Sequence, residues 1–507
     1  MAEPAPTAPG SARRDLAWIA LAAAPGLAIA AARQIGVDFW YDEVRTLRQV
    51  VLVPLGVSAT DYREPNNHVL FSILANLWCR LLGVGDLRAA LESPAALRLL
   101  PFLLAAPGPI LLGAAARRTL GVGAGAVAAA LFASALPFAN FACQFRGYGL
   151  GLTLVAAVLL LAVRWRAEGR RGDLVLLGVA GALAVWAIPL HLHALAAIAL
   201  LHGAIWFGRL RRGGAAAERV RDLGLAAAAV AAGGVGLAFY LPCLGSVLSN
   251  HWSEPKGGPR WETIAGTLPP VLGAMLAGRW WLLAAFGGAA AALALRRGQE
   301  RAAAGAFGWG TGLLLLPFLV SALRGDRPFD RVFLQVLPAF ALAGAAAIRL
   351  SLGPWHGRRW VAPVAVAALA AGGWLALDAR DRRLAEDIEA GVKSQSIERA
   401  YFHAHYRPRE VLSSIAADPE TARLPVTLGT HDREALPAYL AAAGVEARAA
   451  GTLAPGTLYI EISSVEIRWI QVLDANFTRV GGPPSGALRE ITPAGPSFDR
   501  VFLCECR

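Results

Sequence analysis

The residues most suited to chemistry lie near the N-terminus, in the string Asp-Phe-Trp-Tyr-Asp-Glu at positions 38–43, directly after the first apolar run. Asp42 and Glu43 are adjacent, so on a helix or in a turn their side chains point to different sides. One carboxylate can face a cavity and act as a general base for a hydroxyl or an amine, while the other binds backbone or a cation. The alternative is a solvated helix cap, with Trp40 and Tyr41 in the aromatic belt of a membrane protein. The residue types leave both interpretations open.

A second polar string, Asp61 to His68, precedes a shorter apolar segment. Its Glu64 and His68 supply carboxylate and imidazole groups, which together with Asp42 would suit a metal ion or a polar substrate. A Pro-Asn-Asn turn that caps the next helix explains the same residues. The sequence therefore leaves a requirement for a divalent metal open.

Two histidines, His191 and His193, lie at the junction of two later apolar runs, next to Pro189. Ionisable groups at the edge of a membrane span are functional candidates by default, so these histidines are expected to line a cavity and contact phosphate or sugar. A tight proline turn with interfacial histidines is the alternative.

The composition indicates what kind of fold must position these residues. Of 507 residues, 56% are hydrophobic and 17% are charged, and the mean hydropathy is +0.48. A soluble globular protein has about 45–50% apolar and about 25% charged residues, so the chain is predicted to be a membrane protein. The net charge of +12 comes mainly from arginines in short clusters between apolar runs, which indicates membrane topology and no nucleic-acid partner. The five cysteines include no C-x-x-C pair, so neither a zinc site nor a disulfide framework is predicted.

About eleven apolar runs approach the roughly 20 residues that a helix needs to cross the bilayer. They are 17–32, 96–116, 122–139, 148–163, 174–189, 192–207, 223–244, 280–295, 303–323, 332–348 and 361–377. Arginine clusters fall at every second connection, which predicts a multi-pass protein of the cell (inner) membrane with a cytoplasmic N-terminus and an external C-terminus. The segment 68–82 is apolar but too short, and it is predicted to be a helix at the outer interface with Trp78 as an anchor.

The predicted fold is an α-helical polytopic membrane protein with a small C-terminal soluble α/β domain. The tail is assigned to that domain because its charge rises and strand-like runs (424–428, 457–462) alternate with a helical run (433–443). The predicted boundaries are 1–14 for a disordered cytoplasmic arm, 15–377 for the transmembrane domain with external loops at 33–94 and 246–279, and 378–507 for the extracytoplasmic domain.

Several short motifs occur in order along the chain. They are Trp40-Tyr41-Asp42-Glu43, Asn67-His68-Val69-Leu70-Phe71, Asn76-Leu77-Trp78, Leu97-Arg98-Leu99-Leu100-Pro101, Phe145-Arg146-Gly147-Tyr148 and Asp330-Arg331-Val332-Phe333-Leu334. In this order they resemble the polytopic membrane glycosyltransferases of the C superfamily, and most of all family 39, with its protein mannosyltransferases and aminoarabinose transferases. The resemblance covers about residues 15–350. Pro65 follows Glu64 where the aminoarabinose transferases have a lysine, which argues against close identity with that subgroup.

The resemblance implies an inverting transfer of a sugar, outside the cytoplasm, from a polyprenyl-phosphate-linked donor to a protein, lipid or glycan acceptor. Carried over by position, Asp42 would be the catalytic base and Glu43 its acidic neighbour, with Tyr41 in the substrate site. The leaving group would be a lipid phosphate, which needs positive charge at the membrane surface rather than a protonated acid. Arg146 and Arg331 suit that role because a guanidinium binds phosphate bidentately, although each could instead extend to the head groups of membrane lipids.

A polytopic transporter or a flippase for lipid-linked sugars is the alternative function. It predicts charged residues or broken helices in the middle of the membrane. Here the acids and histidines gather at the outer ends of the predicted spans, which favours surface chemistry over transport.

Overall fold

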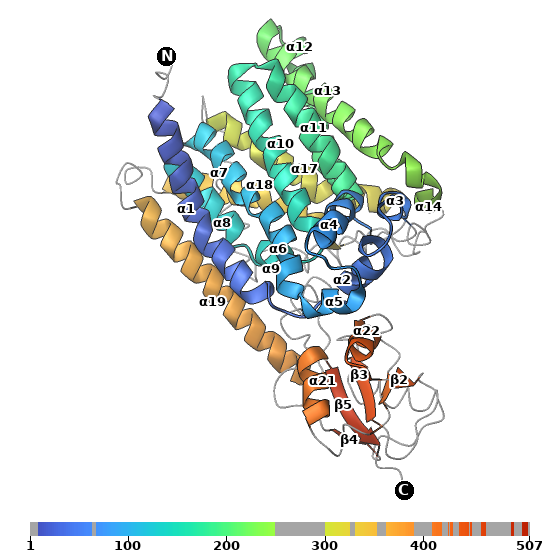
Figure 1. Ribbon diagram of the computed structural model, residues 1–507. Coiled ribbons are helices and arrows are strands. Elements are labelled where there is room, and N and C mark those ends of the chain that lie inside the picture. Colours follow the sequence, from blue (N-terminus) through green and yellow to red (C-terminus); the bar gives the residue numbers. More distant parts are fainter. Residues whose placement is uncertain are drawn as a thin grey trace. The chain divides into compact units, whose positions relative to one another are not determined.

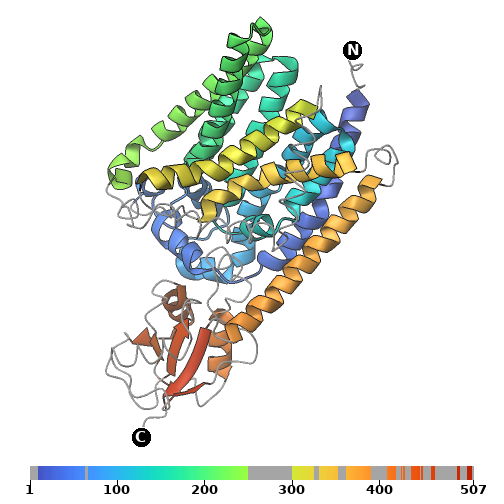
Figure 2. The same ribbon diagram turned by 180° about the vertical axis from the view of Figure 1, so that it is seen from behind.

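The chain divides into two compact units (Figures 1 and 2). Unit 1 comprises Met1–Ala31, Ala59–Phe71 and Pro101–Ala376, and unit 2 comprises Ala32–Ser58, Ser72–Leu100 and Leu377–Arg507. The computed structural model describes residues 9–62, 67–248, 300–324, 330–351, 361–389, 408–417, 424, 426–428, 435–445, 447–448, 458–462, 488–490 and 499–504.

The described part of unit 1 is helical. Its complete helices are α7 (Pro107–Leu120), α8 (Val122–Ala133), α9 (Leu136–Phe141), α10 (Tyr148–Glu168), α11 (Arg171–Ala187), α12 (Leu192–Arg211), α13 (Ala216–Ala238), α14 (Leu244–Leu248), α17 (Glu300–Arg324) and α18 (Leu337–Ser351), with short 3₁₀ turns at Pro189–His191, Leu241–Cys243 and Asp330–Val336. Neighbours in sequence pack as hairpins: α7 on α8, α10 on α11, and α12 on α13. The helices α10 to α13 lie side by side in both views (Figures 1 and 2). Further described helices contribute residues to both units, among them α1 (Pro9–Gln34), α4 (Val69–Leu81), α6 (Pro94–Ala105) and α19 (Val361–Glu389).

Small residues let α1, α7 and α8 approach one another closely. A Cβ placed on Gly113 would lie 2.5 Å from Ile19 Cγ2 and 2.8 Å from the carbonyl oxygen of Gly125. Ile19 packs in a fully buried cluster with Ala129 and Ala133. Packing of small residues is the usual means of holding helices together in lipid, where the hydrophobic effect no longer drives association.

Seven helical segments among the described residues are long and apolar enough to cross a membrane, so the chain is an integral membrane protein. They are Ala12–Gln34, Pro94–Leu120, Tyr148–Glu168, Pro189–Arg211, Ala216–Ala238, Arg331–Arg349 and Ala362–Ala379. Every apolar run predicted from the sequence except 280–295 overlaps a described helix, and that run lies outside the described residues. The total of about eleven spans therefore stays a prediction.

Two sequence predictions need correction, and a third agrees with the helix that is present. The run 122–139 is interrupted, because α8 ends at Ala133 and α9 begins at Leu136, with a proline in its first turn that cannot donate a backbone hydrogen bond. The predicted disordered arm is too long, since α1 begins at Pro9. The predicted interfacial helix is α4, whose 13 residues span about 20 Å and are too short to cross a bilayer of about 30 Å.

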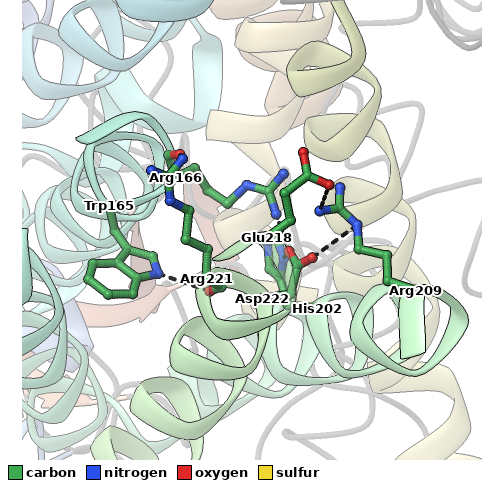
Figure 3. Close-up of polar contacts among 7 residues, drawn as sticks. All are labelled: Trp165, Arg166, His202, Arg209, Glu218, Arg221 and Asp222. Atoms are coloured by element: carbon green, nitrogen blue, oxygen red, sulfur yellow. Dashed lines mark hydrogen bonds and ion pairs between the residues drawn. The ribbon is translucent and has the colours of Figure 1, made fainter. Parts of the chain in front are cut away.

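A buried ion-pair cluster joins the ends of α10, α12 and α13 (Figure 3). Asp222 is 0% exposed and binds the guanidinium of Arg166. It also binds His202 Nδ1 at 3.1 Å and Arg209 Nε at 3.3 Å. A fully buried carboxylate is costly unless it is paired, so Asp222 holds these helices together through its three partners.

Unit 2 combines short helices with a five-stranded sheet. The helices are α2 (Tyr41–Thr46), which continues into a π-helical turn (Leu47–Val51), α3 (Leu55–Thr60, whose last two residues belong to unit 1), α5 (Leu87–Glu92), α21 (Pro408–Ala417) and α22 (Ala435–Ala442). The strands are β1 (Val426–Leu428), β2 (Ala447–Arg448), β3 (Leu458–Ile462), β4 (Leu488–Glu490) and β5 (Asp499–Cys504), in the order β2-β1-β3-β5-β4. β1 runs parallel to β2 and β3, and β5 runs antiparallel to β3 and β4. The predicted strands 424–428 and 457–462 and the predicted helix 433–443 are present as β1, β3 and α22.

Candidate functional site

The acidic string begins a short helix in unit 2 whose geometry depends on one buried ion pair. Glu43 is 0% exposed and Arg98 is 1% exposed, and Glu43 Oε2 lies 2.5 Å from Arg98 Nη2. Glu43 also accepts a hydrogen bond from the backbone N–H of Trp40 at 3.0 Å, which caps α2. The sequence predicts that one acid of the pair binds backbone or a cation, and the Glu43 carboxylate binds both.

Arg98 holds the turn before α2 through the backbone as well. It donates to the carbonyl oxygens of Gln34 at 2.6 Å and Asp38 at 2.9 Å. A buried guanidinium is costly unless its N–H groups are paired, and the fork geometry of arginine allows it to bind several acceptors at once. Arg98 and Glu43 together therefore fix the path of the chain from the end of α1 to α2.

Asp42 is the more accessible carboxylate of the adjacent pair. Its side chain is half-buried, whereas Glu43 is buried. Its carbonyl oxygen accepts a hydrogen bond from Thr46 Oγ1 at 2.8 Å within α2. Beside it, the hydroxyl of Tyr41 accepts from Arg45 Nη1 at 3.0 Å, and the Arg45 guanidinium lies 5.8 Å from the ring centroid of Tyr41.

A second group of candidate residues lies in unit 1, around Tyr148 at the start of α10. Arg331 Nη1 donates to the Tyr148 hydroxyl at 3.0 Å, and its guanidinium lies 5.7 Å from the ring centroid. The Arg146 guanidinium lies 5.4 Å from the same ring, and Arg146 is 3% exposed. Two arginines that are far apart in the sequence therefore contact the same aromatic ring. Their two charges make the electrostatic potential at this end of α10 strongly positive.

His68 belongs to the same group. Its Nδ1 accepts the backbone N–H of Gly147 at 2.8 Å, and its ring packs edge-on against Tyr148 with the centroids 4.7 Å apart. Because Nδ1 accepts, the proton of the neutral ring lies on Nε2, which can donate to an anion. A Cβ on Gly147 would lie 2.9 Å from His68 Cβ, so only glycine permits this contact.

A small cavity opens between α10, the 3₁₀ turn at Pro189–His191 and the turn before α18. Its lining is Tyr148, Leu152, Ile188, Leu190, His191, Arg331, Val332, Leu334 and Gln335. His191 and Gln335 are 5% and 1% exposed, and no side-chain nitrogen or oxygen of either has a well-formed hydrogen bond within the described part of the chain. The cavity has room for about one water molecule. A bridging water can therefore link His191 to a ligand at Arg331, whereas the cavity is too small for a phosphate.

His191 reaches this cavity because α10 has a glycine opposite it. A Cβ on Gly151 would lie 2.0 Å from His191 Nε2. His193 is used differently: its Nδ1 lies 2.9 Å from the carbonyl oxygen of Leu190. This local contact favours the alternative of a tight proline turn for His193.

Some candidates lie outside the described residues, and these are Glu64 and most of the predicted loop 246–279. Within the described residues, no group of three or more His, Cys, Asp or Glu side chains could hold a metal ion.

The sequence interpretation missed the partners that position the candidates. Arg98 lies in one of the motifs that resemble the family, but its position in the sequence indicates no specific role for it. A charge inside the apolar run 96–116 is itself a signal, because ionisable residues within spans are rare and functional by default. Tyr148 and Gln335 carried no comparable signal.

Solved structures of similar fold exist. ArnT from Cupriavidus metallidurans bound to undecaprenyl phosphate superposes with a TM-score of 0.52 at 16% identity, over 96% of this chain and 98% of that chain. The chain has a fold similar to that of ArnT. ArnT is an aminoarabinose transferase of the C superfamily of glycosyltransferases, so the predicted resemblance is confirmed at the level of the fold.

Further comparisons give the extent of this similarity. The apo form of the same ArnT gives a TM-score of 0.52 at 15% identity, over 96% of this chain and 97% of that chain. The Archaeoglobus fulgidus oligosaccharyltransferase in complex with Zn and sulfate gives 0.46 at 12% identity, over 96% of this chain and 73% of that chain. No family profile matches the sequence, and no curated protein matches it.

Proposed function

We propose that the protein is an inverting glycosyltransferase that moves a sugar from a polyprenyl-phosphate-linked donor to an acceptor on the extracytoplasmic face of the membrane. The observation that carries this proposal is that Asp42 and Glu43, although adjacent, lie in different environments. Glu43 is committed to Arg98 and the Trp40 backbone, while Asp42 stays half-buried and accessible to an acceptor.

In this reaction Asp42 accepts the proton of an acceptor hydroxyl or amine. The acceptor oxygen or nitrogen forms a bond to the anomeric carbon of the donor while the bond from that carbon to the phosphate oxygen breaks. The electron pair of the broken bond leaves with the lipid phosphate. A single displacement of this kind inverts the anomeric configuration.

The oxygens of the leaving phosphate are weakly basic, so the phosphate can leave without a proton when positively charged side chains stabilise it. Arg146, Arg331 and the Nε2–H of His68 supply charge-assisted donors in the group around Tyr148. The undecaprenyl phosphate bound to ArnT, a protein of similar fold, supports a polyprenyl phosphate as the carrier.

The membrane arrangement that goes with this function is the one predicted from the sequence. It has about eleven spans, a cytoplasmic N-terminus and a C-terminal domain outside the cell membrane, following the positions of the arginine clusters. The donor and acceptor are then both available on the outer face.

The proposal is tested with the purified protein in lipid nanodiscs and a panel of undecaprenyl-phosphate sugars labelled in the sugar. We expect transfer or slow donor hydrolysis with one of them. Asp42→Asn, which keeps the size and removes the base, should lower the rate at least about a hundredfold. The matched control is Glu92→Gln, an exposed carboxylate in the same unit. Full activity of Asp42→Asn would refute the assignment of the base.

The same panel separates the enzyme from the alternative, a transporter or flippase. A flippase would move the intact lipid-linked sugar between leaflets and break no bond. The cluster around Asp222 does not favour transport, because Arg166, Arg209 and Asp222 lie within two turns of helix ends. Translocation without bond cleavage for every donor would replace the proposal with the flippase.

A further inference from the structure

We infer that the C-terminal part of the chain holds residues 38–43, the acidic turn, in the geometry that the reaction needs. Arg409 and Tyr439 are then positioning residues for Asp42. This inference rests on the proposed function, and it assigns a role to a region whose role the motifs leave open. All the residues concerned lie in unit 2.

The first contact is made by α21. Asp38 is 6% exposed, and its carboxylate accepts the backbone N–H of Arg409 at 3.0 Å and pairs with the Arg409 guanidinium. The Arg409 side chain is 43% exposed. A partly exposed ion pair adds little to global stability, so its main effect is on the direction of the chain at Asp38.

The second contact is made by α22. The Tyr439 hydroxyl accepts the backbone N–H of Phe39 at 2.7 Å and lies 3.4 Å from the Phe39 carbonyl oxygen, to which it donates. Phe39 and Tyr439 are 0% and 2% exposed. Burial raises the pKa of Tyr439, so the hydroxyl keeps its proton and can serve both backbone groups of Phe39.

Arg98 completes the enclosure of the same two residues. It donates to the carbonyl oxygen of Asp38, and its guanidinium lies 5.1 Å from the ring centroid of Phe39. Positions 38 and 39 are therefore held by Arg98 together with Arg409 and Tyr439. We call this set of contacts the C-terminal clamp.

The clamp lies directly before the candidate base. Helix α2 begins at Tyr41, so only Trp40 separates the clamped residues from the helix that carries Asp42. The helix α22 also packs on α2 and on α5. A movement of residues 38 and 39 therefore also moves Asp42. A displacement of about 1 Å of a reacting group can lower the rate about a hundredfold.

The test uses two variants that remove side-chain contacts of the clamp and nothing of the base. Tyr439→Phe removes the hydroxyl and leaves the ring, and Arg409→Gln removes the charge and leaves the backbone N–H to Asp38. Ser413→Ala, an exposed position on α21, is the matched control.

Two measurements are made on each variant in nanodiscs. Hydrogen exchange of the peptide covering residues 38–46 should speed up at least about tenfold in Tyr439→Phe, because the Phe39 N–H loses its partner. The kcat for transfer should fall about tenfold or more in both variants while KM for the donor stays within about twofold, because the donor site is intact. The control should match the wild type in both measurements.

The outcomes separate the inference from the proposed function. Unchanged exchange of residues 38–46 in Tyr439→Phe would overturn the inference, whatever the activity. Faster exchange with an unchanged kcat would also overturn it, since the contact would then be purely structural. If the wild type transfers no sugar, the proposed function fails, and the exchange data alone decide whether the clamp orders the turn.

Discussion

Replacing Glu43 by glutamine is the sharpest test of how the acidic turn is built. The change keeps the shape of the side chain but leaves the guanidinium of Arg98, at 1% exposure, without its counter-charge. Breaking a buried ion pair in this way costs about 3–5 kcal/mol. Glu43→Gln should therefore destabilise the protein by about that amount, far more than the neutralisation of an exposed acid.

A second variant separates the charge from the hydrogen bonds. Glu43→Gln combined with Arg98→Met removes both charges at similar volume, and buried pairs replaced in this way often lose no stability. The double variant should therefore be more stable than Glu43→Gln alone. It should still transfer sugar poorly, because the bonds from Arg98 to the carbonyls of Gln34 and Asp38 are lost.

Unfolding in mixed micelles titrated with SDS, followed by tryptophan fluorescence, measures the stability of each variant. The transfer rate is measured on the same samples below the transition. If Glu43→Gln costs less than about 1 kcal/mol, or if the double variant loses the sum of the two single losses, the charge of Glu43 is not balanced by Arg98 as described.

Three further outcomes are expected. Gly151→Ala should displace His191, because the new Cβ would lie 2.0 Å from Nε2, and should lower transfer about tenfold, whereas Gly178→Ala, which meets no atom within 4 Å, should be neutral in the same assay. Asp222→Asn should lower the free energy of unfolding by about 1.5–3 kcal/mol in the SDS titration, because Asp222 is fully buried while its partners Arg166 and Arg209 are 35% and 27% exposed; a loss below about 1 kcal/mol would show that the Asp222 cluster is dispensable. Arg331→Ala should weaken binding of undecaprenyl phosphate about tenfold in a competition assay, and unchanged competition would remove Arg331 from the phosphate site.

The spans were predictable because lipid imposes a simple rule on sequence. A run such as 148–163 must pair its own backbone groups, and it is part of helix α10 (Tyr148–Glu168). The strands β1 and β3 were predictable for a related reason, since short apolar runs bounded by polar residues pack into sheets. The break at 134–135 was missed because hydropathy does not register the backbone effect of Pro137.

The partners of the candidate residues were not predictable, because they come from distant parts of the chain. The residues that Arg98 binds are 55 to 64 positions away, and Tyr439 is 400 positions from Phe39. Local spacing carries no information about such contacts. It indicated only that adjacent side chains diverge, so that one acid could face a cavity while the other binds backbone or a cation, and not which acid or which partner.

The acidic turn contains three carboxylates, and the structure gives them unequal roles. Asp38 and Glu43 are buried, and each is balanced by an arginine, Arg409 and Arg98 respectively. Asp42 is the accessible one. The three acids of residues 38–43 are therefore one candidate base, Asp42, and two structural carboxylates, Asp38 and Glu43. Neutralising Glu43 should act on rate through geometry and stability together, and neutralising Asp38 should act mainly through geometry, whereas neutralising Asp42 should remove the proton acceptor itself. Glu43→Gln unfolding at a lower SDS fraction than Asp42→Asn, although Asp42→Asn loses transfer while it is still folded, is the pattern that this division requires.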